Sequence, residues 1–185
     1  MDGAMIIRPA QPRDAQALAA IYGWHVLNGT GTFEEAPPSP VEMEARRSAV
    51  AAHGLPYLVA VQDGRVDGFA YAAPFRLRAA YRYTVEDSIY LDPQAIGRGI
   101  GKALLGDVLA ACEALGLRQV VAVIGDSANA ASIGVHRAHG FEPSGVTRGL
   151  GYKGGRWLDV VWMQKALNGG MTGPPAWEGL DLGGG

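Results

Sequence analysis

Apolar residues along the chain follow two alternating spacings, one that predicts strands and one that predicts helices. Short runs rich in apolar and β-branched residues fall at residues 5–8, 56–75, 83–91, 118–125, 142–150 and 156–167. Segments with helical spacing lie between them, at residues 9–29, 39–54, 102–115 and 127–141. The order β-α-α-β-β-β-α-β-α-β-β indicates an α+β (mixed α/β) fold, with a central twisted mixed β-sheet flanked by helices.

Cap and turn residues support several of these boundaries. Ser39 predicts the start of the second helix and Gly54 its end. The dipeptide Asp63-Gly64 divides residues 56–75 into two strands joined by a tight hairpin turn. The continuous apolar run at residues 118–125 is typical of a strand at the centre of a sheet.

The length and composition fit one domain. With 185 residues, we expect a single domain at residues 1–167 and a flexible tail at 168–185, where Gly and Pro are too frequent for regular structure. The net charge of −2 and the lack of a long apolar run predict neither nucleic-acid nor membrane partners. The single cysteine, Cys112, excludes an internal disulfide, so we expect a cytoplasmic protein. The place of Cys112 on an apolar helix stripe predicts that it packs in the core.

Three glycines, Gly97, Gly99 and Gly101, separate a predicted strand from a predicted helix. Such a turn lets the backbone approach a ligand, and the free N–H groups of the helix start attract an anion, so the segment predicts a phosphate site. A Walker loop would need glycine at position 96 and Ser or Thr at 103; a dinucleotide fingerprint would need glycine at 102 or 104. Neither motif fits, and a helix-entry turn without a ligand is the alternative.

At these residues the chain resembles the GNAT N-acetyltransferases. "IGRGIGKALL" and "NAASIGVHRAHGF" are similar to the pyrophosphate loop and the later coenzyme-contacting helix of that superfamily. More narrowly, "YTVEDSIYL", "VVAVIG", "NAASIGVHRAHGF" and "GRWLDVVWMQ" resemble the phosphinothricin and methionine-sulfoximine N-acetyltransferases. One residue departs from the pattern, since Ile96 stands where the superfamily loop usually begins with Gln or Arg.

The resemblance implies a GNAT fold, acetyl-CoA as cosubstrate, no metal, and a homodimer. It implies direct acetyl transfer, in a ternary complex, to the α-amine of L-phosphinothricin, methionine sulfoximine or methionine sulfone. Residues 89–91 would contact the pantetheine arm and the oxyanion through backbone groups, while Arg98 and Lys102 are either phosphate ligands or ordinary solvated cations. The residues assigned to acetyl-CoA are Ile89, Tyr90, Leu91, Gly97, Arg98, Gly99, Ile100, Gly101, Lys102, Asn129 and Ser132.

The reaction needs a base for the amine and benefits from an acid for the departing thiolate. Glu86 lies mid-strand, where a carboxylate is unexpected unless it faces a polar cleft; an exposed position is the alternative, and the resemblance makes it the base. By resemblance His136 protonates the thiolate or orients the substrate, while the residue type alone suggests a surface histidine. Asn129, seven residues earlier, would share its helix face. We expect Asp87 to be a solvent or structural residue and His139 a capping or surface residue.

The acceptor side is predicted from charge and resemblance together. An amino acid with a phosphinate or sulfoximine head needs cations and donors, which Arg76, Arg78 and Arg82 supply on one loop. Trp157 is expected near the site of the same or a partner subunit. Open alternatives are another small amine, a protein N-terminus, or a CoA-binding regulatory module without catalysis. The residues assigned to the acceptor are Phe33, Arg76, Leu77, Arg78, Val85, Glu86 and Lys153.

Overall fold

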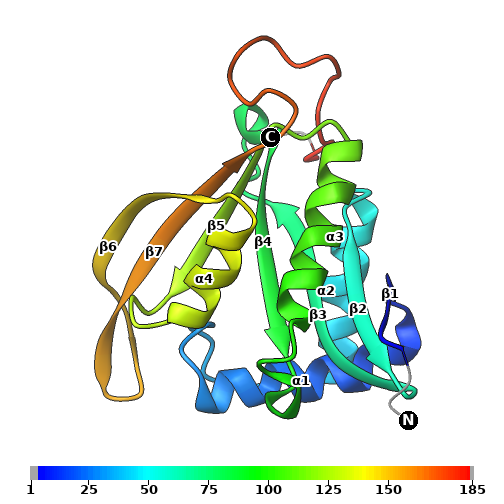
Figure 1. Ribbon diagram of the computed structural model, residues 1–185, viewed down its shortest axis with the longest axis vertical. Helices are drawn as coiled ribbons and strands as arrows, with labels where there is room; N and C mark the ends of the chain where they lie inside the picture. The colour runs from blue at the N-terminus through cyan, green and yellow to red at the C-terminus, as the bar shows by residue number, and fades with distance from the viewer. Residues whose placement is uncertain (1–3, 184–185) are drawn as a thin grey trace.

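The computed structural model describes residues 4–183, which form one β-sheet with helices on both faces (Figure 1). The strands are β1 (Ile6–Pro9), β2 (Tyr57–Gln62), β3 (Arg65–Pro74), β4 (Thr84–Leu91), β5 (Gln119–Gly125), β6 (Glu142–Lys153) and β7 (Arg156–Ala166). The helices are α1 (Ala15–Asn28), α2 (Pro40–Ala52), α3 (Ile100–Ala114) and α4 (Ala130–Ala138). The predicted order of strands and helices is confirmed.

The seven strands follow the order β1-β2-β3-β4-β5-β7-β6, so the sheet is mixed as predicted. Strands β4 and β5 are parallel because α3 connects them, and the other neighbouring pairs are antiparallel. The last pair of the β4–β5 ladder is Asp87 with Ala122, although β4 continues to Leu91 and β5 to Gly125. The two parallel strands therefore separate near the middle of the sheet, at the ends from which α3 and α4 follow (Figure 1).

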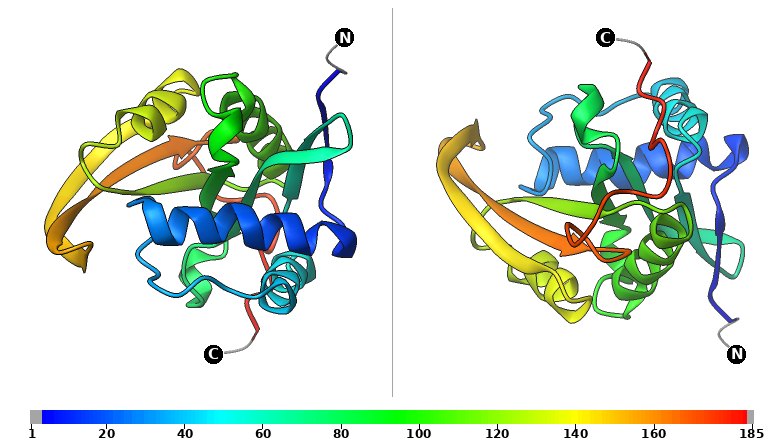
Figure 2. Two further views of the ribbon diagram at one scale, coloured as in Figure 1. Left: turned by 90° about the horizontal axis from the view of Figure 1, so that it is seen from below. Right: turned by 90° about the horizontal axis from the view of Figure 1, so that it is seen from above.

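Helices α1 and α2 lie on one face of the sheet, and α3 and α4 on the other (Figure 2). Helix α1 contacts α2, β3 and β4, whereas α3 contacts α4, β2, β3 and β4. The apolar stripe of α3, including Leu104, Val108 and Cys112, is fully buried, which confirms that Cys112 is a core residue. Among the described residues, no helix is long and apolar enough to cross a membrane.

The predicted cap and turn residues act where the sequence suggests. The Ser39 hydroxyl accepts a hydrogen bond of 3.2 Å from the backbone N–H of Glu42 and so closes the first turn of α2. Asp63 and Gly64 have φ values of +50° and +78°, the left-handed conformation that a tight hairpin between β2 and β3 requires.

The C-terminal segment folds back over the end of the sheet where β7 finishes and α3 ends (Figure 1). Its described part, residues 168–183, contains no helix or strand, in agreement with its Gly and Pro content. Trp177 donates a hydrogen bond of 2.8 Å to the Gly116 carbonyl, and Leu180 is only 7% exposed. The segment is thus packed against the domain, while its predicted flexibility stays a prediction. Residues 184–185 of the predicted tail and 1–3 of the predicted domain lie outside the described residues.

Candidate active site

The glycine turn at residues 96–101 leads from β4 into α3. Gly97 and Gly99 have φ values of +84° and +80°, and a Cβ atom at either would meet no other atom within 4 Å. Left-handed backbone, and not lack of space, therefore requires glycine at both positions. Gly99 is the N-cap, and α3 begins at Ile100, two residues earlier than the sequence predicts. The N–H groups of the first helical turn precede the intrahelical ladder and are available to an anion.

The two cations of the turn have different surroundings. The Arg98 guanidinium hydrogen-bonds to Gln62 and lies 3.4 Å from Asp67, a carboxylate that Arg65 also contacts at 2.8 Å. Lys102 is exposed on the first turn of α3. The charge of Arg98 is therefore partly compensated within the protein, which leaves Lys102 as the more available cation for a phosphate.

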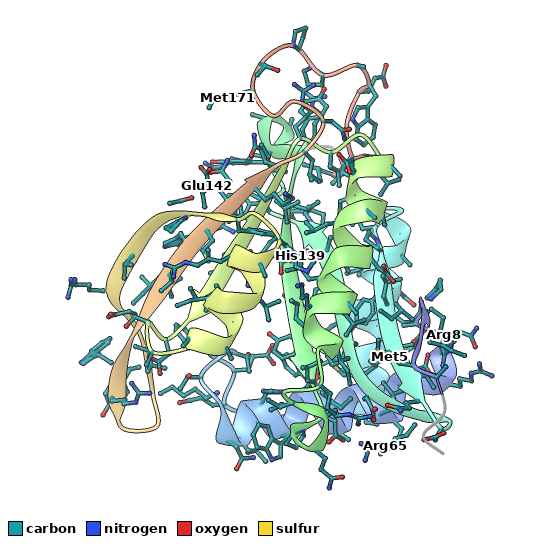
Figure 3. All side chains as sticks on the ribbon, in the orientation of Figure 1. Met5, Arg8, Arg65, His139, Glu142 and Met171 are labelled. Atoms are coloured by element: carbon teal, nitrogen blue, oxygen red, sulfur yellow. The ribbon has the colours of Figure 1, made fainter. Side chains whose placement is uncertain are left out.

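Helix α4 packs against α3, the helix that follows the glycine turn. Asn129 is its N-cap rather than a residue of its interior, and the side-chain oxygen of Asn129 accepts a hydrogen bond of 3.1 Å from the Ser132 N–H. At the other end of α4, the His139 ring contacts the Lys102 carbonyl at 2.8 Å (Figure 3 labels His139). Since a carbonyl only accepts, His139 donates, and it links the end of α4 to the first turn of α3.

His136 and Asp87 form a buried pair between α4 and β4. The side chains are 4% and 2% exposed, and Nε2 of His136 lies 2.8 Å from a carboxylate oxygen of Asp87. Nδ1 of His136 donates to the Ser132 carbonyl at 2.7 Å. A surface histidine at position 136 and a solvent-facing Asp87 are therefore wrong alternatives. Residue type and spacing did not predict the pair. Strand alternation predicts which face of the sheet a side chain occupies, but not which residue of another element it contacts there.

The surroundings of His136 raise its pKa. Burial lowers the pKa, but the hydrogen bond and charge of Asp87 and the Ser132 carbonyl raise it by more. The second carboxylate oxygen of Asp87 is buried and has no hydrogen-bond partner among the described residues. Both ring nitrogens of His136 thus have partners, whereas one oxygen of the Asp87 carboxylate lacks a hydrogen bond.

Glu86 lies on the opposite face of β4 from this pair, because side chains alternate along a strand. Its half-buried carboxyl has a raised pKa: burial raises it, the positive charge of Arg76 lowers it, and the negative charge of Asp87 raises it. The structure therefore does not bring Glu86 and His136 together on one face. Val85 shares the face of Asp87 and is fully buried, so only its backbone is available to a ligand.

The strand end next to the glycine turn is fixed by α1. The Tyr90 ring packs edge-on against Tyr22 at 4.8 Å, and the His25 ring donates from Nε2 to the Leu91 carbonyl at 2.7 Å. Tyr90 thus faces α1, and the Leu91 carbonyl already has a partner. His25 escaped the sequence analysis, because a histidine inside an amphipathic helix carries no local signal of what its ring reaches.

The predicted acceptor arginines lie on the loop between β3 and β4, here called the arginine loop (residues 75–82). The Arg76 guanidinium stacks on the Phe75 ring at 4.3 Å and donates to the Phe75 carbonyl at 2.8 Å. Arg76, Leu77 and Arg78 are exposed and line a hollow of about 770 Å³ together with Ala79 and Tyr81. The loop thus presents two guanidinium groups to solvent. The positive charge of one of them, Arg76, lowers the pKa of Glu86.

Phe33 and Lys153 connect the β6–β7 hairpin to the loop between α1 and α2. A Cβ atom at Gly151 would lie 2.3 Å from the Phe33 ring, so the ring rests directly on the glycine backbone of β6. Lys153 donates to the Thr32 carbonyl at 2.7 Å, and its pKa is lowered by burial although Glu35 and Glu34 raise it. Trp157, at the hairpin end, is 67% exposed.

Comparison with known proteins gives the family. The model of the acetyltransferase (GNAT) family matches residues 18–141, more than half of the chain. The chain belongs to the GNAT family of acetyltransferases. The fold of this GNAT protein and the family predicted from its sequence are therefore confirmed.

Within the family, the chain is similar to acetyltransferases of amino-acid analogues. The GNAT chain is 49% identical over 172 residues, 93% of this chain and 87% of the relative, to the phosphinothricin N-acetyltransferase of Alcaligenes faecalis. It is 40% identical over 169 residues, 91% of this chain and 98% of the relative, to an L-methionine sulfoximine/L-methionine sulfone acetyltransferase of Pseudomonas paraeruginosa. The crystal structure of a phosphinothricin acetyltransferase from Sinorhizobium meliloti in complex with AcCoA has a TM-score of 0.90 and 48% identity, covering 93% of each chain.

Among the described residues, no group of three or more His, Cys, Asp or Glu side chains is arranged to hold a metal ion. The titratable groups around β4 that stand out in this GNAT protein are instead Glu86 on one face and the Asp87–His136 pair on the other.

Proposed function

We propose that this GNAT enzyme transfers the acetyl group of acetyl-CoA to the α-amine of L-phosphinothricin, methionine sulfoximine or methionine sulfone. Relatives named for these acceptors align over 93% and 91% of the chain, and one similar protein was crystallised with AcCoA. The observation that carries the proposal is the half-buried Glu86 carboxyl, coupled to the cationic Arg76 and lying on the strand that ends at the glycine turn.

In the proposed reaction the amine nitrogen attacks the acetyl carbonyl, the carbon–sulfur bond breaks, and the CoA thiolate leaves. The amine is protonated near neutral pH, so its proton must be removed before or during attack. We assign this proton to Glu86, directly or through a water. The burial that raises the pKa of Glu86 makes its carboxylate a stronger base, which supports the assignment.

Backbone groups supply most of the proposed acetyl-CoA site. The N–H groups from Gly97 to Lys102 suit a pyrophosphate at the start of a helix, and Ile100 contributes only its N–H because its side chain is buried. The edge of β4 beyond Asp87, residues 88–91 without the Leu91 carbonyl that His25 occupies, suits the amide groups of pantetheine in the manner of an added strand. The Asn129 amide N–H₂ and the Ser132 hydroxyl complete this set.

For His136 the contacts support positioning over acid catalysis. Both ring nitrogens have protein partners and the side chain is 4% exposed. To protonate the CoA thiolate, Nε2 of His136 would have to give up the proton that it shares with the buried Asp87 carboxylate. We therefore assign His136 to hold α4, and with it Asn129 and Ser132, against β4.

On the acceptor side, Arg76 and Arg78 are proposed to bind the acidic or polar head of the amino-acid analogue. A guanidinium fork suits the two oxygens of a phosphinate, and its N–H groups also serve a sulfone or sulfoximine oxygen. Phe33 and Lys153 are proposed to close the pocket from the side of the β6–β7 hairpin, because each links that hairpin to the α1–α2 loop.

We also propose that the enzyme is a cytoplasmic homodimer. Strand β6 lies at the edge of the sheet, and its side chains Val146, Leu150 and Tyr152 are 53%, 54% and 59% exposed. A long edge strand with exposed apolar residues is a surface that soluble proteins usually cover. A second copy would cover it and would bring Trp157 of each hairpin to the interface.

The proposed activity is tested by measuring CoA release with a panel of amines. We expect turnover with at least one of L-phosphinothricin, L-methionine sulfoximine and L-methionine sulfone, and kcat/KM values for peptides with free N-termini at least about ten-fold lower, because the head group adds contacts in the bound state. Acetyl-CoA binding without turnover of any amine would leave a regulatory CoA-binding protein as the correct interpretation. Faster turnover of peptides than of the three analogues would favour a protein N-terminal acetyltransferase.

The acetyl-CoA assignment predicts a specific effect of Gly99→Ala. Left-handed backbone costs a residue with a Cβ about 1–2 kcal/mol, so relaxation of the turn is expected to raise the KM for acetyl-CoA by roughly ten-fold. Gly64→Ala is the matched control, because Gly64 also has a positive φ of +78° and open space but lies in the β2–β3 turn. Equal KM values for acetyl-CoA in the two variants would contradict the assignment.

A further inference from the structure

The arginine loop is bound to the rest of the domain at few points. Its ends continue into β3 and β4, and the Phe75 N–H donates to the Thr84 carbonyl at 3.2 Å. Among the described residues, the hydrogen bonds of residues 76–82 stay within the loop, apart from one bond to the C-terminal segment. Apart from the two strands that flank the loop, the C-terminal segment is therefore the part of the described chain that hydrogen-bonds to it.

The C-terminal segment contacts the loop directly. The Leu180 N–H donates to the Arg82 carbonyl at 2.9 Å. Gly179 lies so close that a Cβ atom there would be 2.3 Å from Cγ of Arg82 and 2.9 Å from the Tyr83 ring. Tyr83 in turn donates to the Trp177 carbonyl at 3.1 Å, and the two rings meet edge-on at 6.1 Å. A hollow of about 380 Å³ is lined by loop residues on one side and by residues 178–183 on the other.

The same segment is anchored, independently of the loop, to the residues that follow α2 and α3. The Arg118 side chain donates to the carbonyls of Gly170 and Gly173 at 2.7 Å and 3.0 Å. Near the end of the segment, the His53 ring after α2 donates to the Asp181 carbonyl at 2.8 Å. With Leu180 buried in the core, these contacts fix the segment against the residues that follow α2 and α3, so it can act as a support for the loop.

We propose that residues 168–183 form a C-terminal strap that positions the arginine loop for the amino-acid acceptor. The proposal rests on the proposed function of the loop. The strap touches neither the glycine turn nor α4 in the contacts described above, so loosening it is expected to affect the acceptor and not acetyl-CoA. This makes the segment a specificity element for the reaction, rather than an inert extension.

Gly179→Ala tests the strap at its closest approach to the loop. The new Cβ cannot fit beside the Arg82 and Tyr83 side chains as they lie, so either the strap or these side chains must shift, and the contact between strap and loop is disturbed in both cases. The KM for the acceptor is expected to rise roughly five-fold, the size of one lost hydrogen bond that orders the loop, with kcat and the KM for acetyl-CoA unchanged. Gly183→Ala is the matched control, since Gly183 also has a positive φ, of +69°, but open space around it. Met171→Ala, at a site in the strap that is 95% exposed, is a second control (Figure 3).

A readout without activity separates this proposal from the proposed function. Trypsin cleaves after arginine, and Arg76, Arg78 and Arg82 lie on the loop. Gly179→Ala, and a variant that ends at residue 175, are expected to be cut in the loop several-fold faster than the wild type and Gly183→Ala. Equal cleavage rates would overturn the strap. Faster cleavage in an enzyme that acetylates none of the three analogues would keep the strap and overturn the acceptor assignment. An equal rise in both KM values would show a general loss of structure and overturn the specific role.

Discussion

Glu86→Gln is expected to lower kcat by about 10²–10⁴-fold, the usual contribution of a general base, while leaving the KM for acetyl-CoA nearly unchanged. The amide keeps the size and shape of the carboxyl but cannot accept the amine proton. Steady-state CoA release at saturating acetyl-CoA and acceptor measures the effect. Glu113→Gln, an exposed position on α3, is the control and should retain full activity.

The loss in Glu86→Gln should not come from unfolding. Burial raises the pKa of Glu86 above that of the unfolded chain, so ionised Glu86 destabilises the fold at neutral pH. Removing that charge should leave the free energy of unfolding at pH 7 equal to or above that of the wild type. An active site that carries a group at a cost in stability is common in enzymes.

The pH profile gives a second test of Glu86. A base acts only when ionised, so kcat/KM should fall as the pH drops through the raised pKa of Glu86. The positive charge of Arg76 holds that pKa down, so Arg76→Ala should move the acidic limb to higher pH. If Glu86→Gln keeps wild-type activity at every pH, Glu86 is not the base.

The order of elements was predictable because each carries its own local signal. Hydrophobic spacing distinguishes strands from helices, Ser39 and Asp63-Gly64 mark a cap and a turn, and the apolar stripe that contains Cys112 predicts a buried helix face. Boundaries were less accurate: α3 begins at Ile100, because the left-handed Gly99 already serves as its N-cap.

The partners of the site residues were less predictable than the residues themselves. The acidic dipeptide Glu86-Asp87 in a strand was a visible signal, but spacing could not show that Asp87 meets His136, 49 positions later in the chain. The contacts of His25 with β4 and of Leu180 with the arginine loop are equally non-local. Local sequence specifies which face a side chain occupies, and tertiary packing decides what lies opposite.

Strand alternation divides the chemistry of β4 between its faces. Glu86 points to the side of α1 and α2, where its pKa responds to Arg76, whereas Asp87 points to α3 and α4 and binds His136. In the proposed mechanism one strand thus serves proton transfer on one face and the placement of α4 on the other. Substitutions at the two neighbouring positions should therefore have different consequences, one for turnover and one for stability.

His136→Ala is expected to lower the free energy of unfolding by about 3–5 kcal/mol, because it leaves the Asp87 carboxylate buried without its partner. For a chain of this size that is roughly a 10 °C fall in Tm, which thermal unfolding measures. His139→Ala is the control: it removes one hydrogen bond to the Lys102 carbonyl, worth about 1 kcal/mol. The double variant Asp87→Ala/His136→Ala contains no unpaired buried carboxylate. Its decrease in the free energy of unfolding should therefore be smaller than the sum of the decreases in the two single variants.

The same pair predicts how stability changes with pH. Burial lowers the pKa of His136, but Asp87 and the Ser132 carbonyl raise it above the value in the unfolded chain. The pair therefore contributes its full charge-linked stability below about pH 6.5, the ordinary histidine value, and loses it as the pH rises through the raised pKa. In Asp87→Asn the side-chain amide can donate to Nε2 of a neutral His136 ring, so the dependence of stability on pH should become flatter. A loss under about 1 kcal/mol in His136→Ala, or no change of the pH dependence in Asp87→Asn, would show that the pair does not hold α4 to β4.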